Sequence, residues 1–252
     1  MSVVGKACIV TGATSGIGLA IARELAVNGA DLLLVGRNGG KGNEIASSLR
    51  DAGRAASFVA ADLADRSAPQ RIVEVAVEAY GRIDVLVNNA GILTHTTVLD
   101  CTDEEWDSVI DVNLSAAFRL SRAVLAPMLE QRSGAIVNVA SDWALMGARG
   151  ATAYAVSKAA LAQLTRCVAL DYADKGIRVN AVCPGNTDTP MLEHIFPDKD
   201  RDWMLRNFAR DIPMRRIARA DEVAKVVAFL AGGDASFMTG SLVPVDGGTS
   251  AQ

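Results

Sequence analysis

The chain of 252 residues is poor in the residues that bind metals or form disulfides. It has two histidines and four cysteines, the latter scattered at positions 8, 101, 167 and 183 with no CxxC pair. A zinc site or a disulfide framework is therefore not expected. Aromatic residues make up 5% of the chain and basic residues form no run, which argues against a nucleic-acid partner.

Long hydrophobic runs are also missing. No apolar stretch approaches the roughly 20 residues that span a bilayer, and the N-terminus lacks the apolar region of a signal peptide. We therefore expect a cytoplasmic protein with no membrane partner. With 50% hydrophobic residues and no linker-like break in composition, residues 1–252 are expected to form a single domain around one large core.

Short apolar runs alternate with helix-like segments along the whole chain. The runs are continuously apolar, as in strands that are buried on both faces. This alternation predicts an α/β fold, a doubly wound parallel sheet of about seven strands with helices on both faces. The expected strands are 7–10, 31–35, 55–60, 85–88, 135–139, 178–183 and 242–245, and the expected helices are 16–28, 40–52, 68–80, 103–131, 152–175 and 221–231.

One connection, residues 186–219, is longer than most loops and mixes apolar and charged residues with three prolines. Long insertions of this kind are often lids over an active site, so we expect a substrate lid here.

A glycine-rich turn, TGATSGIG, follows the first expected strand at residues 11–18, and the next helix is expected to begin near Gly18. Glycines let a backbone turn tightly against a pyrophosphate, and a helix N-terminus then offers free N–H groups. A tight turn without a ligand would also explain the glycines, but the position between strand and helix favours dinucleotide binding. The candidate binding residues are Gly12, Thr14, Ser15, Gly16, Ile17 and Gly18.

Tyr154 and Lys158 lie four residues apart in a segment with helical composition, with Thr152 as the expected helix cap. Residues at this spacing share one helix face, so the Lys158 ammonium can lie beside the Tyr154 phenol. A nearby cation lowers the phenol pKa from its usual value of about 10 and suits the group to proton transfer. Alone, the pair could equally be a surface contact.

Further motifs occur in a fixed order: NNAG at 88–91, Asn113, Ser141, YAVSK at 154–158 and PG at 184–185. With the glycine-rich turn, they make the chain similar to the short-chain dehydrogenase/reductase family, from Lys6 to the DGG at 246–248. The resemblance implies a Rossmann-type fold and reversible hydride transfer between a nicotinamide cofactor, NADP(H) or NAD(H), and a ketone or secondary alcohol.

The resemblance also implies roles for four residues. Tyr154 would be the general acid/base, and Lys158 would lower its pKa and hold the nicotinamide ribose. Ser141 would stabilise the substrate oxygen, and Asn113 would interrupt its helix and hold a water in a proton relay. Without the resemblance, Ser141 could simply end a strand and Asn113 could be a surface helix residue.

Other positions would bind the remaining parts of the cofactor. Asp62 would face the adenine, although an Asp after a strand is more often a helix cap. Thr187 stands where the family more often has Val or Ile. The further candidates are Leu63, Asn89, Ala90, Gly91, Pro184, Gly185 and Thr189.

The end of the second strand bears on the choice of cofactor. An acidic residue here usually binds the ribose 2′-hydroxyl of NAD, but this chain has Gly36 followed by Arg37. The Arg37 guanidinium suits a 2′-phosphate, so NADP is favoured and NAD stays possible. A solvated Arg37 is the simpler alternative.

The substrate pocket should be largely apolar. His95 and Arg149 could bind an anionic group, although both are more simply read as surface residues. The candidate substrate residues are Leu93, His95, Trp143, Met146, Met191, Leu192 and Trp203, with Leu145, Ile195, Phe196 and Phe208 as further lining.

A free ketone or secondary alcohol is the favoured substrate. A 3-oxoacyl-(acyl-carrier-protein) reductase is an alternative, made less favourable by Leu170, where such reductases commonly have Arg. A non-enzymatic dinucleotide-sensing protein is the alternative of another class, although the catalytic set is complete here. In this family the two long helices usually pair between subunits, so a homotetramer or homodimer is expected.

Overall fold

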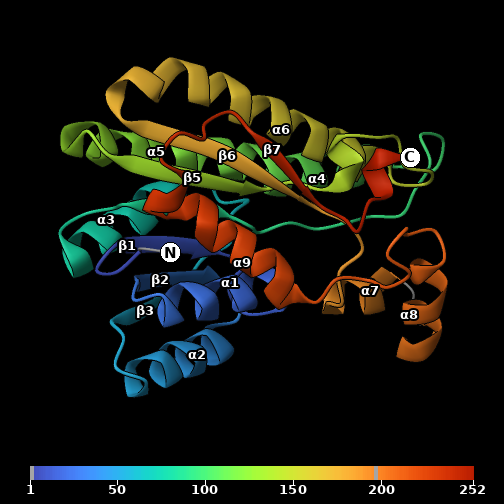
Figure 1. The fold of residues 1–252 in the computed structure, drawn as a ribbon, viewed down its shortest axis with the longest axis horizontal. Coiled ribbons are helices and arrows are strands. Elements are labelled where there is room, and N and C mark those ends of the chain that lie inside the picture. The colour runs from blue at the N-terminus through green and yellow to red at the C-terminus, as the bar shows by residue number, and fades with distance from the viewer. Residues whose placement is uncertain (1–2, 196–197) are drawn as a thin grey trace.

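A computed structural model describes residues 3–195 and 198–252, and its central feature is one parallel sheet of seven strands (Figure 1). The strand order is β3-β2-β1-β4-β5-β6-β7, and all six neighbouring pairs are parallel. The strands are β1 (Ala7–Thr11), β2 (Asp31–Gly36), β3 (Ala56–Ala60), β4 (Val85–Asn88), β5 (Gly134–Val139), β6 (Ile177–Pro184) and β7 (Leu242–Val245).

The central strands are covered on both faces, which explains their continuously apolar sequence. Every residue of β1, β4 and β5 is buried. In the register, Ile9 pairs with Leu33 of β2 and Leu86 of β4, and all three are 1% exposed or less. Each expected strand agrees with an observed one to within one residue at either end, so the predicted Rossmann-type parallel sheet is confirmed.

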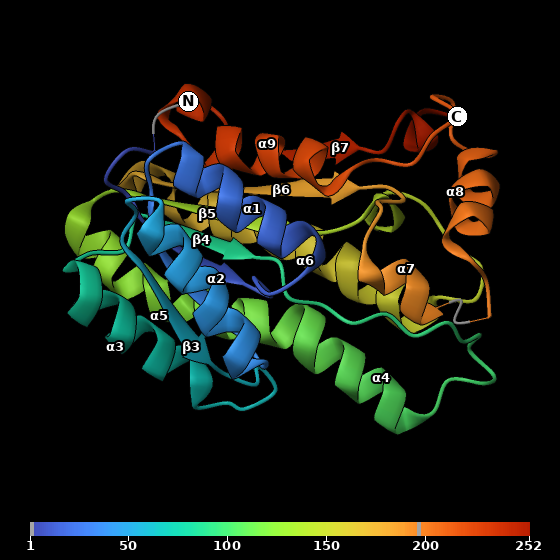
Figure 2. The same ribbon diagram turned by 90° about the horizontal axis from the view of Figure 1, so that it is seen from below.

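Helices cover both faces of the sheet (Figures 1 and 2). On one face α1 packs on α9, and α2 packs on β3. On the other face α3 packs on α5, while α6 packs on β6 and α4 packs on α6. Their bounds are α1 (Gly16–Val27), α2 (Gly39–Asp51), α3 (Ala68–Tyr80), α4 (Asp103–Ile110), α5 (Ala116–Gln131), α6 (Thr152–Tyr172) and α9 (Ala220–Ala231).

Helix boundaries depart from the sequence-based expectation in two places. The start of α1 at Gly16 agrees with the expected range 16–28 and lies two residues before the start near Gly18 that is expected from the glycine-rich turn. Thr152 is not a cap: it is the first residue of α6, and Ala151 before it has no side chain that could cap. The expected helix over 103–131 is divided by a π-helical turn at Asp111–Ser115.

The segment 186–219 contains two short helices, α7 (Pro190–Ile195) and α8 (Arg201–Ala209). In Figures 1 and 2 both lie beyond the carboxyl ends of the strands, to the right of the sheet. The chain reverses direction across the sheet between β1 and β4. Open α/β sheets bind their ligands at such a reversal, outside the carboxyl ends of the strands.

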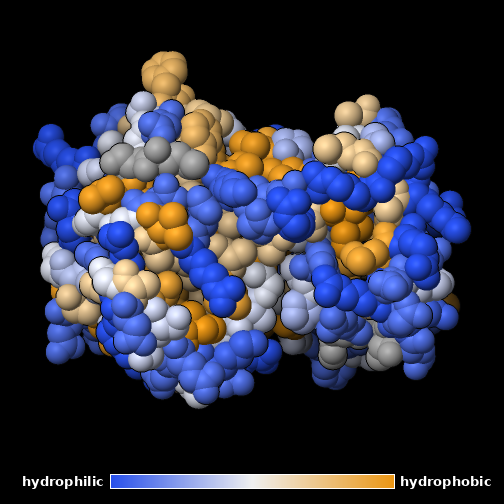
Figure 3. Space-filling model, turned by 60° about the horizontal axis from the view of Figure 1, so that its bottom comes forward, coloured by the Kyte–Doolittle hydropathy of each residue, from blue (hydrophilic) through white to orange (hydrophobic). Residues whose placement is uncertain are grey.

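Within residues 3–195 and 198–252, no helix combines the length and the apolar character that crossing a bilayer requires. The face seen in Figure 3 is largely hydrophilic, with hydrophobic residues visible in recesses between charged ones.

Candidate active site

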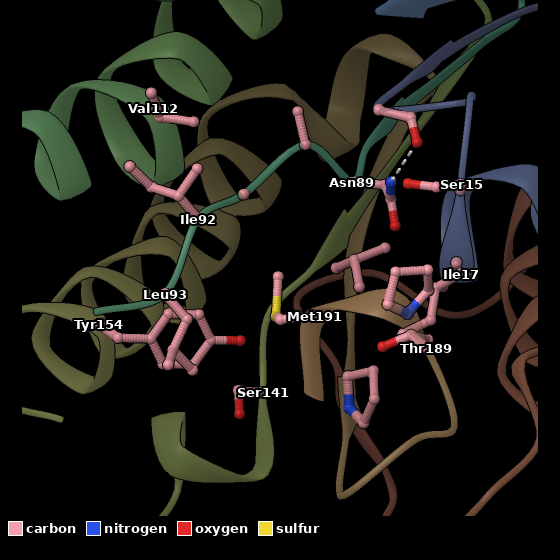
Figure 4. Close-up of a pocket in the computed structure, with 18 of the residues that line it drawn as sticks. Ser15, Ile17, Asn89, Ile92, Leu93, Val112, Ser141, Tyr154, Thr189 and Met191 are labelled. Atoms are coloured by element: carbon pink, nitrogen blue, oxygen red, sulfur yellow. Dashed lines mark hydrogen bonds between the residues drawn. The ribbon is translucent and has the colours of Figure 1, made fainter. Parts of the chain in front are cut away.

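A cavity of about 690 Å³ lies at the carboxyl ends of the strands and joins most of the predicted site residues. Figure 4 shows Ser141 and Tyr154 on one side of it and Ser15, Ile17 and Thr189 on the other. From the sequence-based candidates for catalysis and cofactor binding, the lining contains Gly12, Thr14, Ser15, Gly16, Ile17, Gly18, Arg37, Asp62, Leu63, Asn89, Ala90, Gly91, Ser141, Tyr154, Lys158, Pro184, Gly185, Thr187 and Thr189.

The glycine-rich turn needs its glycines for two separate reasons. Gly12 has a φ of 64°, which side chains rarely adopt, and a Cβ there would lie 2.8 Å from Asn89 Nδ2. Gly18 allows α1 to approach β1 closely, since a Cβ on it would lie 2.2 Å from Gly12 O. The first residues of α1, Gly16 to Gly18, line the cavity.

Thr11 and Asn89 lock the ends of β1 and β4 together. The Thr11 hydroxyl donates to Val87 O at 3.2 Å and accepts from the backbone N–H groups of Asn89 and Ala90 at 2.9 and 3.0 Å. In return, Asn89 Nδ2 donates to Thr11 O at 2.8 Å. Thr11 opens the TGATSGIG motif, but the sequence did not indicate this role, since its partners lie more than 70 positions away; these bonds fix the turn on which a ligand would rest.

Ser141, Tyr154 and Lys158 are brought together from two elements. Ser141 follows β5, and the other two stand one turn apart on α6. All three are at most 8% exposed. Lys158 Nζ donates to Val139 O at 2.8 Å and lies 5.6 Å from the centroid of the Tyr154 ring. The ring also meets Trp143 edge-on at 5.7 Å.

Burial dominates the acid–base properties of this group. It raises the pKa of Tyr154 to about 12, against the smaller opposing effect of the Ser141 hydrogen bond. It also lowers the pKa of Lys158 to about 8. In the protein alone the pKa of Tyr154 is therefore not lowered below its usual value, because desolvation of the phenol dominates and Lys158 is not among the groups that shift it.

Asn113 sits in the π-helical turn and is 1% exposed, so the alternative of a surface residue is wrong. Its side chain clamps the backbone of Ile92: Nδ2 donates to Ile92 O at 2.9 Å, and Oδ1 accepts from Ile92 N at 2.8 Å. Nδ2 also donates to Ser157 Oγ at 3.0 Å. A π turn is a common feature of functional sites in helices, and here it places an amide against the cavity-lining loop.

The opposite end of the cavity is formed by Arg37 and Asp62, both exposed. No carboxylate stands at Gly36, where β2 ends. Asp62 is not a helix cap, since Oδ1 accepts from Ala64 N at 3.0 Å and α3 begins only at Ala68. Its side chain instead stabilises the turn that follows β3.

Gly91, in the loop after β4, allows the backbone to pass close to the side chains of Asn113 and Lys158. A Cβ on Gly91 would lie 3.2 Å from Asn113 Oδ1 and 3.4 Å from Lys158 Nζ. On the far wall, Thr187 is 5% exposed and its hydroxyl donates to Gly185 O at 2.9 Å. The hydroxyl shapes this turn in a way that the Val or Ile common in the family would not.

The predicted substrate residues divide into two groups. Met146 and Trp203 do not line the cavity, and neither does Leu145. Leu145 and Met146 follow the short 3-10 turn at Asp142–Ala144, and Leu145 is 39% exposed. Phe196 and the side chain of Ile195 lie outside the described residues. The cavity is lined by Leu93, His95, Trp143, Arg149, Met191, Leu192 and Phe208.

Comparisons with known proteins identify the family of the chain. A family model described as Enoyl-(Acyl carrier protein) reductase matches residues 12–250. Oxidoreductase UcpA of Salmonella typhimurium is 41% identical, over 98% of this chain and 95% of its own. The 3-oxoacyl-(acyl-carrier-protein) reductase FabG of Thermotoga maritima is 40% identical, over 98% and 99%.

A crystal structure from Beutenbergia cavernae, provisionally described as an NAD(P)-dependent gluconate 5-dehydrogenase with NADP bound at low occupancy, superposes with a TM-score of 0.92. It is 39% identical and the alignment covers 100% of this chain and 99% of that one. The match over residues 12–250 and these full-length relatives show that the chain belongs to the short-chain dehydrogenase/reductase family of oxidoreductases.

Proposed function

We propose that the protein interconverts a ketone and a secondary alcohol with a nicotinamide cofactor, and that Tyr154 is the general acid/base. The observation that carries this proposal is the joint burial of Tyr154, Ser141 and Lys158 at one end of a cavity whose other end is the glycine-rich turn. A phenol with a pKa of about 12 stays protonated at neutral pH, and this is the form that a proton donor needs.

The cavity residues fit a nicotinamide dinucleotide. The cradle formed by Gly12 and Gly18 would be filled by any Cβ, and the start of α1 offers backbone N–H groups for a pyrophosphate. Asp62 and Leu63 would hold the adenine, Asn89 to Gly91 the ribose side, and the 184–189 turn the nicotinamide. When bound, the cofactor supplies or accepts the hydride.

The residues of the chain manage the proton. In ketone reduction Tyr154 donates its proton to the carbonyl oxygen, and the charge on Lys158 stabilises the phenolate left behind. Ser141 stabilises negative charge on the same oxygen. Trp143 packs against Tyr154 and excludes water from the phenol. Asn113 holds the loop at Ile92 and stands beside Lys158, where it would hold a water that returns the proton.

NADP(H) is the cofactor that we favour over NAD(H). Arg37 lines the cavity and forms no ion pair with any of the described residues, so its guanidinium can take a 2′-phosphate. With no carboxylate at Gly36, the end of β2 does not repel that phosphate. The similar structure that contains NADP supports this choice.

The substrate that we favour is a small ketone that carries an anionic group. Arg149 and His95 both line the cavity at its Tyr154 end, where the acidic lining residue, Asp142, is buried. Gly150 packs the two segments together, since a Cβ on it would lie 2.8 Å from the His95 ring. The similar gluconate dehydrogenase, described as acting on a sugar acid, points the same way.

A 3-oxoacyl-(acyl-carrier-protein) reductase is the second candidate, because FabG of Thermotoga maritima is 40% identical over nearly the whole chain. Leu170 on α6 is 83% exposed and offers no charge to an acidic carrier protein. Comparing turnover of a 3-oxoacyl thioester on carrier protein with that on a small free thiol separates the candidates: only a carrier-dependent reductase should strongly prefer the former.

The segment 186–219 is proposed to be a lid within a single domain of residues 1–252. Thr189, Met191 and Phe208 reach the cavity from it. We also propose a homotetramer or homodimer. An open recess lined by Leu114, Phe118 and Leu164, where α5 and α6 meet the π turn, would receive the same helices of a second subunit, and Phe118 is 45% exposed there.

Tyr154→Phe tests the catalytic proposal. The substitution removes only the hydroxyl, so the cofactor should bind as before while turnover falls at least about 10²-fold, the contribution expected of a general acid. Turnover near the wild-type value would contradict the proposed mechanism. A wild-type protein that binds NADPH but reduces no ketone would instead support a non-enzymatic sensor.

A further inference from the structure

The carboxylate of Asp142 lies directly beside the proposed oxyanion-stabilising hydroxyl. Asp142 follows Ser141 in the chain, is 5% exposed, and lines the cavity. Ser141 Oγ donates to Asp142 Oδ1 at 3.0 Å. Trp143 N–H donates to both groups, at 2.9 Å to Oδ1 and at 3.2 Å to Ser141 Oγ. The sequence pattern carried no sign of this arrangement, and the proposed mechanism does not use Asp142.

These bonds limit what Ser141 can offer to a substrate. A hydroxyl has one proton and two lone pairs. The proton is directed to Asp142 and one lone pair accepts from Trp143 N–H, so Ser141 has no second proton to offer to the cavity. A ketone oxygen also only accepts hydrogen bonds. In this arrangement Ser141 cannot stabilise it.

The carboxylate of Asp142 is buried among other titratable groups. None of the described residues forms an ion pair with it. The titratable groups that interact with it are Tyr154 on α6, Cys183 on β6 and Asp246 after β7, and Lys158 lies close to Tyr154 and Cys183. Lys158 is directed to Val139 O, and Asp246 carries the same charge as Asp142.

We propose that Asp142 is a positioning residue whose protonation releases the Ser141 hydroxyl to the substrate oxygen, so that ketone reduction is gated by pH. This inference rests on the proposed function. When Asp142 is ionised, it holds the Ser141 proton and places a negative charge near the forming alkoxide. When Asp142 is neutral, its acceptor strength falls, the charge is gone, and Ser141 can donate to the alkoxide.

The environment of Asp142 places this change in an accessible range. Burial, with the nearby Asp246 charge as a smaller contribution, raises the pKa of Asp142 to about 6, although hydrogen bonds from Ser141 and Trp143 oppose the rise. Tyr154, with its pKa of about 12, stays protonated at the pH where Asp142 titrates, so it does not add its own titration there. The expected rate of ketone reduction therefore falls as pH rises through about 6.

The test is the pH dependence of kcat for ketone reduction at saturating NADPH and ketone. A single oxyanion-stabilising donor contributes about 10²–10³ in rate, so wild-type kcat should fall at least about tenfold from pH 5 to pH 8. Asp142→Asn keeps the shape of the side chain and removes its charge. The amide NH2 can donate to Ser141 Oγ, which leaves the hydroxyl proton of Ser141 available to the substrate. This variant should show a pH-independent kcat near the wild-type value at pH 5.

A double-mutant cycle separates positioning from a merely structural role. In a Ser141→Ala background, Asp142→Asn should lose most of its effect on the pH profile, because the hydroxyl through which it acts is gone. Asp142→Ser, a second neutral variant, should also abolish the fall in kcat and serves if the Asn variant does not fold.

Two outcomes would overturn the inference in distinguishable ways. If kcat still falls with pH in both Asp142 variants, or if the Asn variant has a lower kcat than the wild type at every pH, the role of Asp142 is overturned while the proposed function stands. A wild-type protein that turns over no ketone overturns the proposed function, and this inference with it. Thermal unfolding provides a readout independent of activity: Asp142→Asn should raise Tm at pH 8 more than at pH 4.

Discussion

Replacement of Lys158 by Met should stabilise the protein at neutral pH while it abolishes activity. Lys158 is 3% exposed, and no carboxylate pairs with it among the residues that the structure describes. Its ammonium is held by one backbone carbonyl, Val139 O, at 2.8 Å. A buried cation of this kind favours function over stability, which is typical of active sites.

The magnitude follows from the pKa, which burial lowers from 10.5 to about 8. Each pKa unit corresponds to about 1.4 kcal/mol, so the charged form costs the folded state about 3 kcal/mol at pH 7. Loss of the hydrogen bond to Val139 O offsets about 1 kcal/mol. The net gain of about 2 kcal/mol should raise Tm by about 4–8 °C in a domain of this size.

The sign of the pH dependence gives a sharper test. Between about pH 8 and 10.5 the unfolded chain holds a proton on Lys158 that the folded chain does not, so wild-type stability rises with pH in this window. The Lys158→Met variant lacks this titration. The stability difference between the two proteins should therefore shrink above pH 8, vanish at about pH 10, where the remaining cost of the charge equals the lost hydrogen bond, and change sign above it.

The assay is urea unfolding, followed by tryptophan fluorescence, at pH 7, 9 and 10 and at one protein concentration. Lys41→Met, a change at an exposed position on α2, is the matched control and should alter the free energy of unfolding by less than about 0.5 kcal/mol at each pH. A Lys158→Met variant that is less stable than the wild type at pH 7, or a difference that does not change with pH, would refute the reasoning.

Three further changes test other parts of the site. Arg37→Ala should raise the Kd for NADPH at least about tenfold in fluorescence titrations and leave the Kd for NADH nearly unchanged. An equal rise in Kd for both cofactors would argue against a phosphate contact. Gly18→Ala should abolish cofactor binding, because its Cβ would lie 2.2 Å from Gly12 O, whereas Gly39→Ala, with nothing within 4 Å, should be neutral. Arg149→Gln should raise KM for a keto acid but not for its methyl ester, and an equal change for both would argue against an anion contact.

Much of the fold could be predicted because its signals are local. Continuously apolar runs marked the strands of a sheet that is covered on both faces, and their bounds agreed to within one residue. The TGATSGIG turn and the YAVSK segment indicated the two ends of one cavity, since each carries its chemistry within a few residues.

Features that depend on distant contacts could not be predicted. Thr11 acts through partners on β4, and Asp142 matters only because the turn after β5 folds its carboxylate onto Ser141. Helical spacing placed Lys158 near Tyr154 but could not show that burial would raise the pKa of the phenol. Met146 and Trp203 have the right chemistry for a substrate pocket, yet neither lines the cavity, because their place in the fold depends on contacts that the sequence does not show.

The most direct test of the central claim is the transfer of deuterium from NADPH labelled at nicotinamide C4. Wild-type protein would be incubated with each C4 epimer of the labelled cofactor and a panel of small ketones and keto acids, and the products analysed by mass spectrometry. We predict that one epimer delivers deuterium to the carbinol carbon and that Tyr154→Phe abolishes this transfer. Absence of label in every product, from a protein that binds NADPH, would contradict the claim that this cavity carries out hydride transfer.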